Sequence, residues 1–140
     1  MSIQGGCLCG TVRYECSKPA LLQFNCHCHD CQRSTGAAYA PVAFFPAESV
    51  LISGKVRYFQ SFGGSGKTVS RGFCPGCGSQ LFGLVDVLPA LISVRAGTFD
   101  NPAIFQPKAN LFVSHAAPWN HIDHALATFL RNAPQGGQSS

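Results

Sequence analysis

Apolar and polar positions alternate along much of this chain, which indicates short β-strands. In the segment Gly10–Cys16, Val12 and Tyr14 point to one face while their charged or polar neighbours point to the other, the period of a half-buried strand. Six further runs are rich in β-branched or aromatic residues and are bounded by Gly, Pro or Ser, and they predict strands at 40–45, 56–62, 68–73, 79–85, 91–96 and 111–113. The pattern predicts a mainly β fold.

Helices should be few and short, because prolines are spread along the chain and each removes an amide donor. The three-to-four spacing of Ile122, Leu126 and Phe129 behind a capping Asn120 predicts one helix over Asn120–Leu130. A second short helical turn is expected after Cys28.

The sequence as a whole predicts a single domain over residues 1–133. Gly63–Gly66 lies between two predicted strands and is interpreted as a hairpin loop, with a flexible lid as the alternative. From Pro134 onward the tail has nothing apolar to bury, so we expect it to be disordered.

Charge and cysteine content restrict the class of protein. Charged residues make up 11% of the chain, well below the roughly one quarter typical of soluble domains, so metal crosslinks would help to hold the fold together. The net charge of +4 is scattered from Arg13 to Arg131 without a basic run, which disfavours nucleic acid as a partner. We expect a cytoplasmic protein without membrane contact, since neither a leader nor a run of about 18 apolar residues is visible. Eight cysteines in a reducing compartment favour metal ligands or reactive groups over disulfides.

The first metal motif is Cys74-Pro75-Gly76-Cys77-Gly78, a Cys-x-x-Cys pair followed by glycine. Such a knuckle points two thiolates at one ion, and a structural Zn²⁺ requires four ligands. Cys7 and Cys9 are the simplest source of the other two. The spacing therefore predicts a closed Cys₄ site.

The second motif offers three sulfurs, from Cys26, Cys28 and Cys31. Three protein ligands with an open fourth position distinguish catalytic from structural zinc. His27 and His29 flank Cys28, and we interpret them as groups that orient the ligands or carry protons rather than as ligands. The alternative is a second structural site that one of these histidines closes; an iron–sulfur cluster and a disulfide framework are the weaker alternatives.

Other reactive or aromatic residues have plainer interpretations. Cys16 is interpreted as a buried core thiol, and Trp119 as a core residue or a pocket wall. His115, His121 and His124 lie apart from the clusters in the sequence and are interpreted as ordinary residues.

Three motifs closely resemble the glutathione-dependent formaldehyde-activating family, whose relatives include centromere protein V. They are Gly5-Gly6-Cys7-x-Cys9-Gly10, Cys26-His27-Cys28-x-x-Cys31-x-x-x-x-Gly36 and Gly72-Phe73-Cys74-Pro75-x-Cys77-Gly78-Ser79. The resemblance runs in order from about Gly5 to Trp119. It implies a tent-like fold of small antiparallel sheets that a structural zinc on Cys7, Cys9, Cys74 and Cys77 and a second zinc on Cys26, Cys28 and Cys31 hold together. It also favours an irregular rather than a helical final segment.

The resemblance further implies a carbon–sulfur lyase that joins formaldehyde to glutathione or a related thiol, giving S-hydroxymethylglutathione. Cys26, Cys28 and Cys31 would form the catalytic zinc site, with His27 or His29 carrying the proton. Glutathione carries two carboxylates, so Arg33, the nearest basic residue in sequence, is the candidate clamp. In one departure, Asn110 stands where family members commonly carry a histidine. The other function class is a zinc-stapled module that binds a protein or nucleic acid without catalysis.

Overall fold

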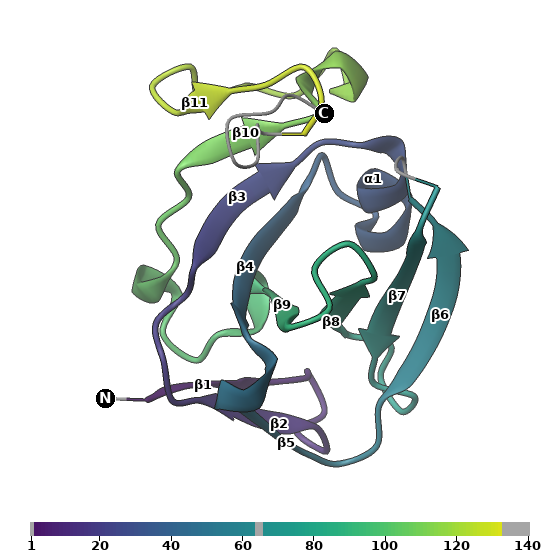
Figure 1. The fold of residues 1–140 in the computed structure, drawn as a ribbon, viewed down its shortest axis with the longest axis vertical. Coiled ribbons are helices and arrows are strands. Elements are labelled where there is room, and N and C mark those ends of the chain that lie inside the picture. Colours follow the sequence, from purple (N-terminus) through teal and green to yellow (C-terminus); the bar gives the residue numbers. More distant parts are fainter. Residues whose placement is uncertain (1, 64–65, 133–140) are drawn as a thin grey trace. The chain divides into compact units, whose positions relative to one another are not determined.

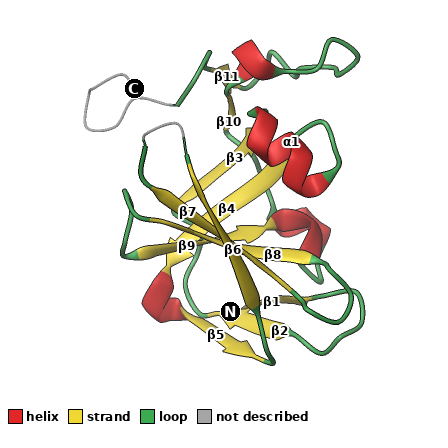
Figure 2. Ribbon diagram, turned by 90° about the vertical axis from the view of Figure 1, so that its right-hand side faces the viewer, coloured by secondary structure: helices red, strands yellow, loops and turns green. Residues whose placement is uncertain are grey.

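The computed structural model describes residues 2–63 and 66–132, and these form two compact units (Figure 1). The first unit holds the described residues of 1–22 and 43–105, and the second holds those of 23–42 and 106–132. Strands dominate both units, and Figure 2 shows how little of the chain is helical. The predicted mainly β fold of small sheets with few helices is therefore confirmed. The expectation of one domain over 1–133 stays a prediction.

Two antiparallel sheets build the first unit. One has the order β1-β2-β5, from Ile3–Gly6, Arg13–Cys16 and Val50–Ser53. The other contains neighbouring strands in the order β9-β8-β7-β6, from Leu91–Arg95, Gln80–Val85, Thr68–Phe73 and Arg57–Phe62. Three short 3-10 turns, Ala47–Ser49, Ala96–Thr98 and Pro102–Ile104, connect the strands.

The core of the first unit is aromatic and aliphatic. The ring of Tyr14 on β2 meets Phe82 on β8 edge-on, with ring centroids 5.4 Å apart, and Phe45 meets Phe99 in the same manner at 6.2 Å. Cys16 is fully buried in this core, as predicted. Burial of these rings is the main apolar stabilisation of the unit.

The second unit combines α1 with parallel strand pairs. β10 (Ala109–Leu111) pairs in parallel with β3 (Leu22–Cys26) on one side and with β11 (Ala127–Thr128) on the other. α1 spans His29–Thr35 and begins where the short helical turn was expected. β4 (Ala40–Pro46) begins in this unit and ends in the first, and a 3-10 turn follows β10 at Val113–His115.

The predicted helix over Asn120–Leu130 is wrong. This segment contains turns and the short strand β11, because its backbone bonds to β10 and to the residue before it: Ala127 N donates to Lys108 O at 3.3 Å and Phe129 N donates to Asn110 O at 2.9 Å. Ile122, Leu126 and Phe129, whose spacing suggested a helix, are half-buried. The irregular final segment that the family resemblance implied is the observed one.

Other predictions differ from the structure in detail. Four strands were missed, namely β1, β3, β5 and β11. They are short, or they carry glycine or side-chain amides at positions that interrupt the alternation of apolar and polar residues. Strands predicted at 10–16 and 111–113 lie instead at Arg13–Cys16 and Ala109–Leu111. Trp119 is 72% exposed, which contradicts a core position.

Two predictions touch residues outside the described range. β6 and β7 are antiparallel neighbours in register from Arg57↔Phe73 to Phe62↔Thr68, as a hairpin requires, although residues 64 and 65 of its loop are not described. The tail from Pro134 lies wholly outside. In the described part of the chain, no helix is long and apolar enough to cross a bilayer.

Truncating the core ring of Phe82 tests the packing of the first unit. Phe82 is 1% exposed, so Phe82→Ala should lower the free energy of unfolding by about 3 to 5 kcal/mol, measured by urea denaturation with metal present. The control Phe62→Ala removes the same ring at a position that is 75% exposed and should change stability by less than about 0.5 kcal/mol. Equal losses in the two variants would contradict the assigned core.

Candidate metal centres

The first cysteine cluster lies entirely in the first unit. The sulfurs of Cys7, Cys9, Cys74 and Cys77 lie within 4.8 Å of one another, so one ion could contact all four. Cys7 and Cys74 are buried, while Cys77 is half-buried and Cys9 is exposed. The motifs predicted that these four cysteines form one cluster, and the fold brings their sulfurs together.

Two similar turns present these sulfurs. After Cys7, the amide of Gly10 donates to the Cys7 carbonyl at 3.1 Å, and after Cys74 the amide of Gly78 donates to the Cys74 carbonyl at 2.8 Å. Both glycines have positive φ, 81° and 78°, which the turn needs and glycine adopts without strain. A β-bulge between Gly72 and Phe73 precedes the second turn and redirects the strand there.

Hydrogen-bond donors surround the sulfurs of this cluster. The backbone amide of Val12 lies 3.3 Å from Cys7 Sγ and lowers the pKa of that thiol to about 7. The hydroxyl of Ser79, 3.2 Å from Cys77 Sγ, lowers the pKa of Cys77 to about 5. Ser79 Oγ also accepts from the amide of Leu8 at 3.0 Å, which ties the two turns together. These donors favour the thiolate, the form that binds a metal.

The second cluster lies entirely in the second unit, where β3 ends and α1 begins. Cys26 is the last residue of β3, Cys28 is the N-cap of α1, and Cys31 lies in its first turn. Their three sulfurs lie within 4.8 Å of one another, and the amide of Cys31 donates to Cys28 Sγ at 3.3 Å. The extended Cys28, with φ −61° and ψ 154°, lets the chain turn so that all three sulfurs converge.

Crowding of sulfurs raises the pKa of Cys26. Interaction with the Cys28 and Cys31 sulfurs is the main cause, and burial of Cys26 adds to it. Three thiolates this close repel one another unless a cation lies among them. A thiophilic divalent ion such as Zn²⁺ would remove that conflict, so the donor set fits a metal.

The two histidines of this motif have different surroundings. His27 is 1% exposed, and its ring nitrogens contact the side-chain amides of Asn110, at 3.2 Å, and Asn120, at 3.3 Å. His29 is exposed, and its ring stacks on His115 with centroids 4.8 Å apart. Neither imidazole belongs to the cluster of convergent ligand atoms. The geometry therefore gives no support to a second site closed by a histidine.

Sequence reasoning overlooked His115. It lies 86 residues from His29, yet its Nδ1 accepts from the His29 amide at 3.4 Å and its carbonyl accepts from Gln32 Nε2 at 2.9 Å. Phe112, with φ 57°, turns the chain so that His115 reaches α1, and its ring lies 5.5 Å from that of His115. No spacing or motif could have revealed this neighbour. His121 and His124 are exposed, in agreement with their plainer interpretation.

Arg33 lies in the last turn of α1 and is exposed. It follows the buried Cys31 by two residues, so about 200° of helical rotation separates the two side chains. Its role as a carboxylate clamp stays a prediction.

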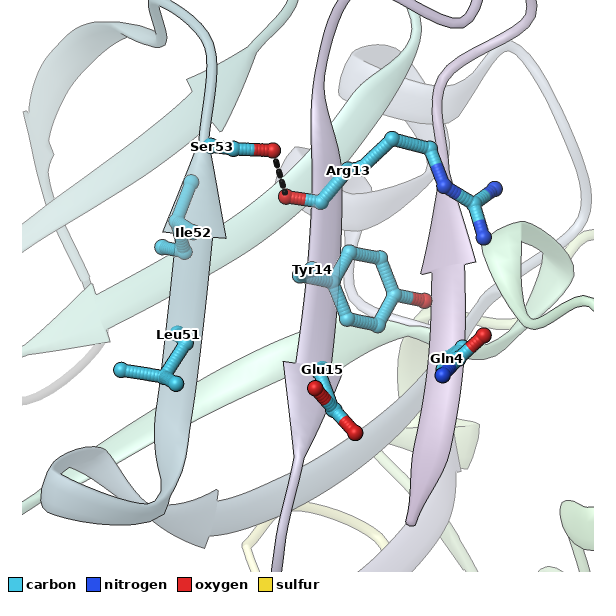
Figure 3. Close-up of a pocket in the computed structure, with 7 residues that line it drawn as sticks. All are labelled: Gln4, Arg13, Tyr14, Glu15, Leu51, Ile52 and Ser53. Atoms are coloured by element: carbon cyan, nitrogen blue, oxygen red, sulfur yellow. Dashed lines mark hydrogen bonds between the residues drawn. The ribbon is translucent and has the colours of Figure 1, made fainter.

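A hollow of about 320 Å³ lies elsewhere, over the β1-β2-β5 sheet (Figure 3). The residues that line it are Gln4, Arg13, Tyr14, Glu15, Leu51, Ile52 and Ser53. None of them is a cysteine or a histidine, so this hollow is separate from both candidate metal centres.

Comparisons with known proteins agree with these motifs. The family model described as "Glutathione-dependent formaldehyde-activating enzyme" matches residues 2–115. A Halomonas elongata protein named "Putative glutathione-dependent formaldehyde-activating enzyme" is 26% identical over 129 residues, which cover 88% of this chain and 82% of that protein. A crystal structure of a Rhodobacter sphaeroides protein has the same fold, with a TM-score of 0.55 and 22% identity over 71% of this chain and 92% of the other. Because the family model covers most of the chain and both cysteine clusters, this protein belongs to the glutathione-dependent formaldehyde-activating family.

Proposed function

We propose that this protein is a zinc-dependent carbon–sulfur lyase that acts on glutathione or a related thiol adduct. The observation that carries the proposal is the second cluster: three sulfurs converge, and no fourth protein ligand joins them in the described residues. The family name supports a thiol partner and formaldehyde chemistry.

The first cluster is proposed to hold a structural Zn²⁺. Four sulfurs complete a tetrahedral set and leave no position for a substrate. The ligands come from two turns more than sixty residues apart in the chain, so the ion would restrict the unfolded chain and stabilise the fold.

The second cluster is proposed to hold a catalytic Zn²⁺ on Cys26, Cys28 and Cys31. A zinc ion bound there would supply a Lewis acid that favours the thiolate form of a thiol at its fourth position. The three cysteines would hold the ion. In the described residues, no fourth ligand atom joins these sulfurs, which would leave room for a substrate sulfur.

The proposed reaction forms one carbon–sulfur bond. The sulfur of the substrate thiolate adds to the carbonyl carbon of formaldehyde, the π electrons move to the carbonyl oxygen, and that oxygen takes up the proton that the thiol lost. The reverse reaction breaks the same bond. Neither direction needs an oxidant or a reductant. His29 is our candidate for carrying the proton because its ring is exposed, whereas both ring nitrogens of His27 already have amide partners.

Substitution of one cysteine from each cluster should separate the two roles of zinc. Cys28→Ser should lose one exchangeable zinc ion and keep a folded circular dichroism spectrum, whereas Cys74→Ser should lose the other zinc and unfold. Zinc per chain is measured by atomic absorption. The control Cys16→Ala alters a buried cysteine outside both clusters and should retain both ions. Collapse of the fold in Cys28→Ser would instead indicate two structural sites.

The same cluster should be required for thiol chemistry. Cys28→Ser should reduce the rate of adduct formation or cleavage, followed by NMR and corrected for the uncatalysed reaction, by about 100-fold or more. Titration calorimetry with glutathione should give heat with the wild type and none with the variant. Heat from another low-molecular-weight thiol alone would exclude glutathione as the substrate. A protein that binds no thiol and accelerates neither direction would refute the enzymatic proposal.

Arg33→Ala tests the proposed clamp. If the guanidinium pairs with a glutathione carboxylate, KM for glutathione should rise about tenfold with kcat nearly unchanged, since one charge-assisted hydrogen bond is lost. Arg57→Ala, at an exposed arginine of the first unit, is the matched control and should leave KM unchanged. An unchanged KM in Arg33→Ala would remove Arg33 from the site.

A further inference from the structure

Every polar group of His27, in the backbone and in the ring, has a hydrogen-bond partner. His27 nevertheless lies between two proposed metal ligands in the sequence. Its amide donates to Leu111 O at 2.9 Å, and its carbonyl accepts from Gln32 Nε2 at 2.7 Å. The imidazole is 1% exposed, with the Tyr39 ring at a centroid distance of 5.1 Å. A buried side chain with this many partners has little freedom to turn toward the cysteine sulfurs.

Two amides contact the ring, and the second partner of Asn110 sets the direction of its amide. Asn110 Nδ2 donates to the carbonyl of Asp123 at 3.0 Å, so its Oδ1 is the atom that faces His27 Nε2. An amide oxygen only accepts, so Nε2 must carry the hydrogen. On the other side of the ring, Asn120 Nδ2 lies 3.3 Å from His27 Nδ1, so a donor faces the nitrogen that carries no hydrogen in this tautomer. The contact with Asn110 therefore specifies the Nε2–H tautomer, and the contact with Asn120 is compatible with it.

We propose that Asn110 is a positioning residue which, together with Asn120, holds His27 in the Nε2–H tautomer and keeps this imidazole away from the metal. His27 then has no lone pair left for an ion, because Nδ1 accepts a hydrogen bond and Nε2 carries a hydrogen. The fourth position beside Cys26, Cys28 and Cys31 stays available to a thiol. This last consequence rests on the proposed function, whereas the tautomer does not.

The surrounding fold is built to hold Asn110 in this orientation. Asn110 is 2% exposed and lies on β10, between β3 and β11. The carbonyl of Asp123 that fixes its amide belongs to a turn in which Asp123 Oδ1 accepts from the Ala125 amide at 2.9 Å. The cysteine-free segment from Asn120 to Thr128 is thereby part of the candidate metal centre. To bind a metal, His27 would have to give up hydrogen bonds of buried groups, which is costly.

The tautomer can be measured directly on the full-length, zinc-loaded protein. Two-bond ¹H–¹⁵N correlation spectra of ¹⁵N-histidine-labelled protein, assigned with His27→Gln, report each imidazole nitrogen. We expect His27 Nδ1 at a shift typical of an unprotonated, metal-free nitrogen and Nε2 at one typical of a protonated nitrogen. A hydrogen on Nδ1, or a metal-bound shift at either nitrogen, would overturn the proposal whether or not any variant folds.

Variants test the role of the amides. Asn110→Leu removes the acceptor at Nε2, so His27 should lose its fixed tautomer: in the same spectra the Nε2 shift should move away from the protonated value, while the first site keeps its zinc, measured by chelator competition. Asn120→Ala should do the same more weakly and serves if Asn110→Leu does not fold. The control Leu111→Ala truncates a buried neighbour on β10 and should reduce stability while keeping the tautomer and the zinc affinity.

Unchanged His27 nitrogen shifts in both asparagine variants would overturn the positioning role. A protein with the expected tautomer and zinc affinities that binds no thiol would refute the proposed function and leave this inference intact. The two failures are therefore distinguishable.

Discussion

The close approach of cysteine sulfurs is the constraint on which both candidate centres depend. Seven sulfurs lie in two groups, each with its members within 4.8 Å of one another. Thiolates at this separation repel, and neutral thiols make only weak hydrogen bonds, so apolar packing alone does not explain why the fold gathers them. A bound cation would explain it. The turns at Gly10 and Gly78 and the bulge before Cys74 are local features whose common effect is to bring sulfurs to one point.

The two centres differ in what completes the ligand set. In the first, two similar turns supply four sulfurs, and donors such as the Val12 amide and the Ser79 hydroxyl stabilise their charge. In the second, the end of β3 and the beginning of α1 supply three sulfurs. The imidazole of His27, which could have been the fourth ligand, faces two asparagine amides instead. In the proposed function, the contrast between a structural and a reactive metal depends on where one histidine side chain is held.

Sequence reasoning succeeded where the relevant interactions are local. The strand Thr68–Phe73 was predicted at its observed limits, since alternation and bounding glycines are properties of a short segment. Reasoning failed at 120–130, where backbone bonds to Lys108 and Asn110 outweigh an apparent helical periodicity. It also missed His115, whose contact with His29 arises from chain packing, and it offered two rival roles for His27 that spacing could not separate.

By itself, the sequence determined the mainly β class, the two cysteine sets and the family, because glycine-flanked cysteine spacings carry their chemistry in a few adjacent residues. Tertiary structure alone decided that His27 is turned toward Asn110 and Asn120 and that His115 lies against His29. It also decided that a cysteine-free C-terminal segment helps to shape the second centre. The physical reason is that hydrogen-bond direction and ligand convergence depend on atoms brought together from distant parts of the chain, and no local pattern encodes their relative positions.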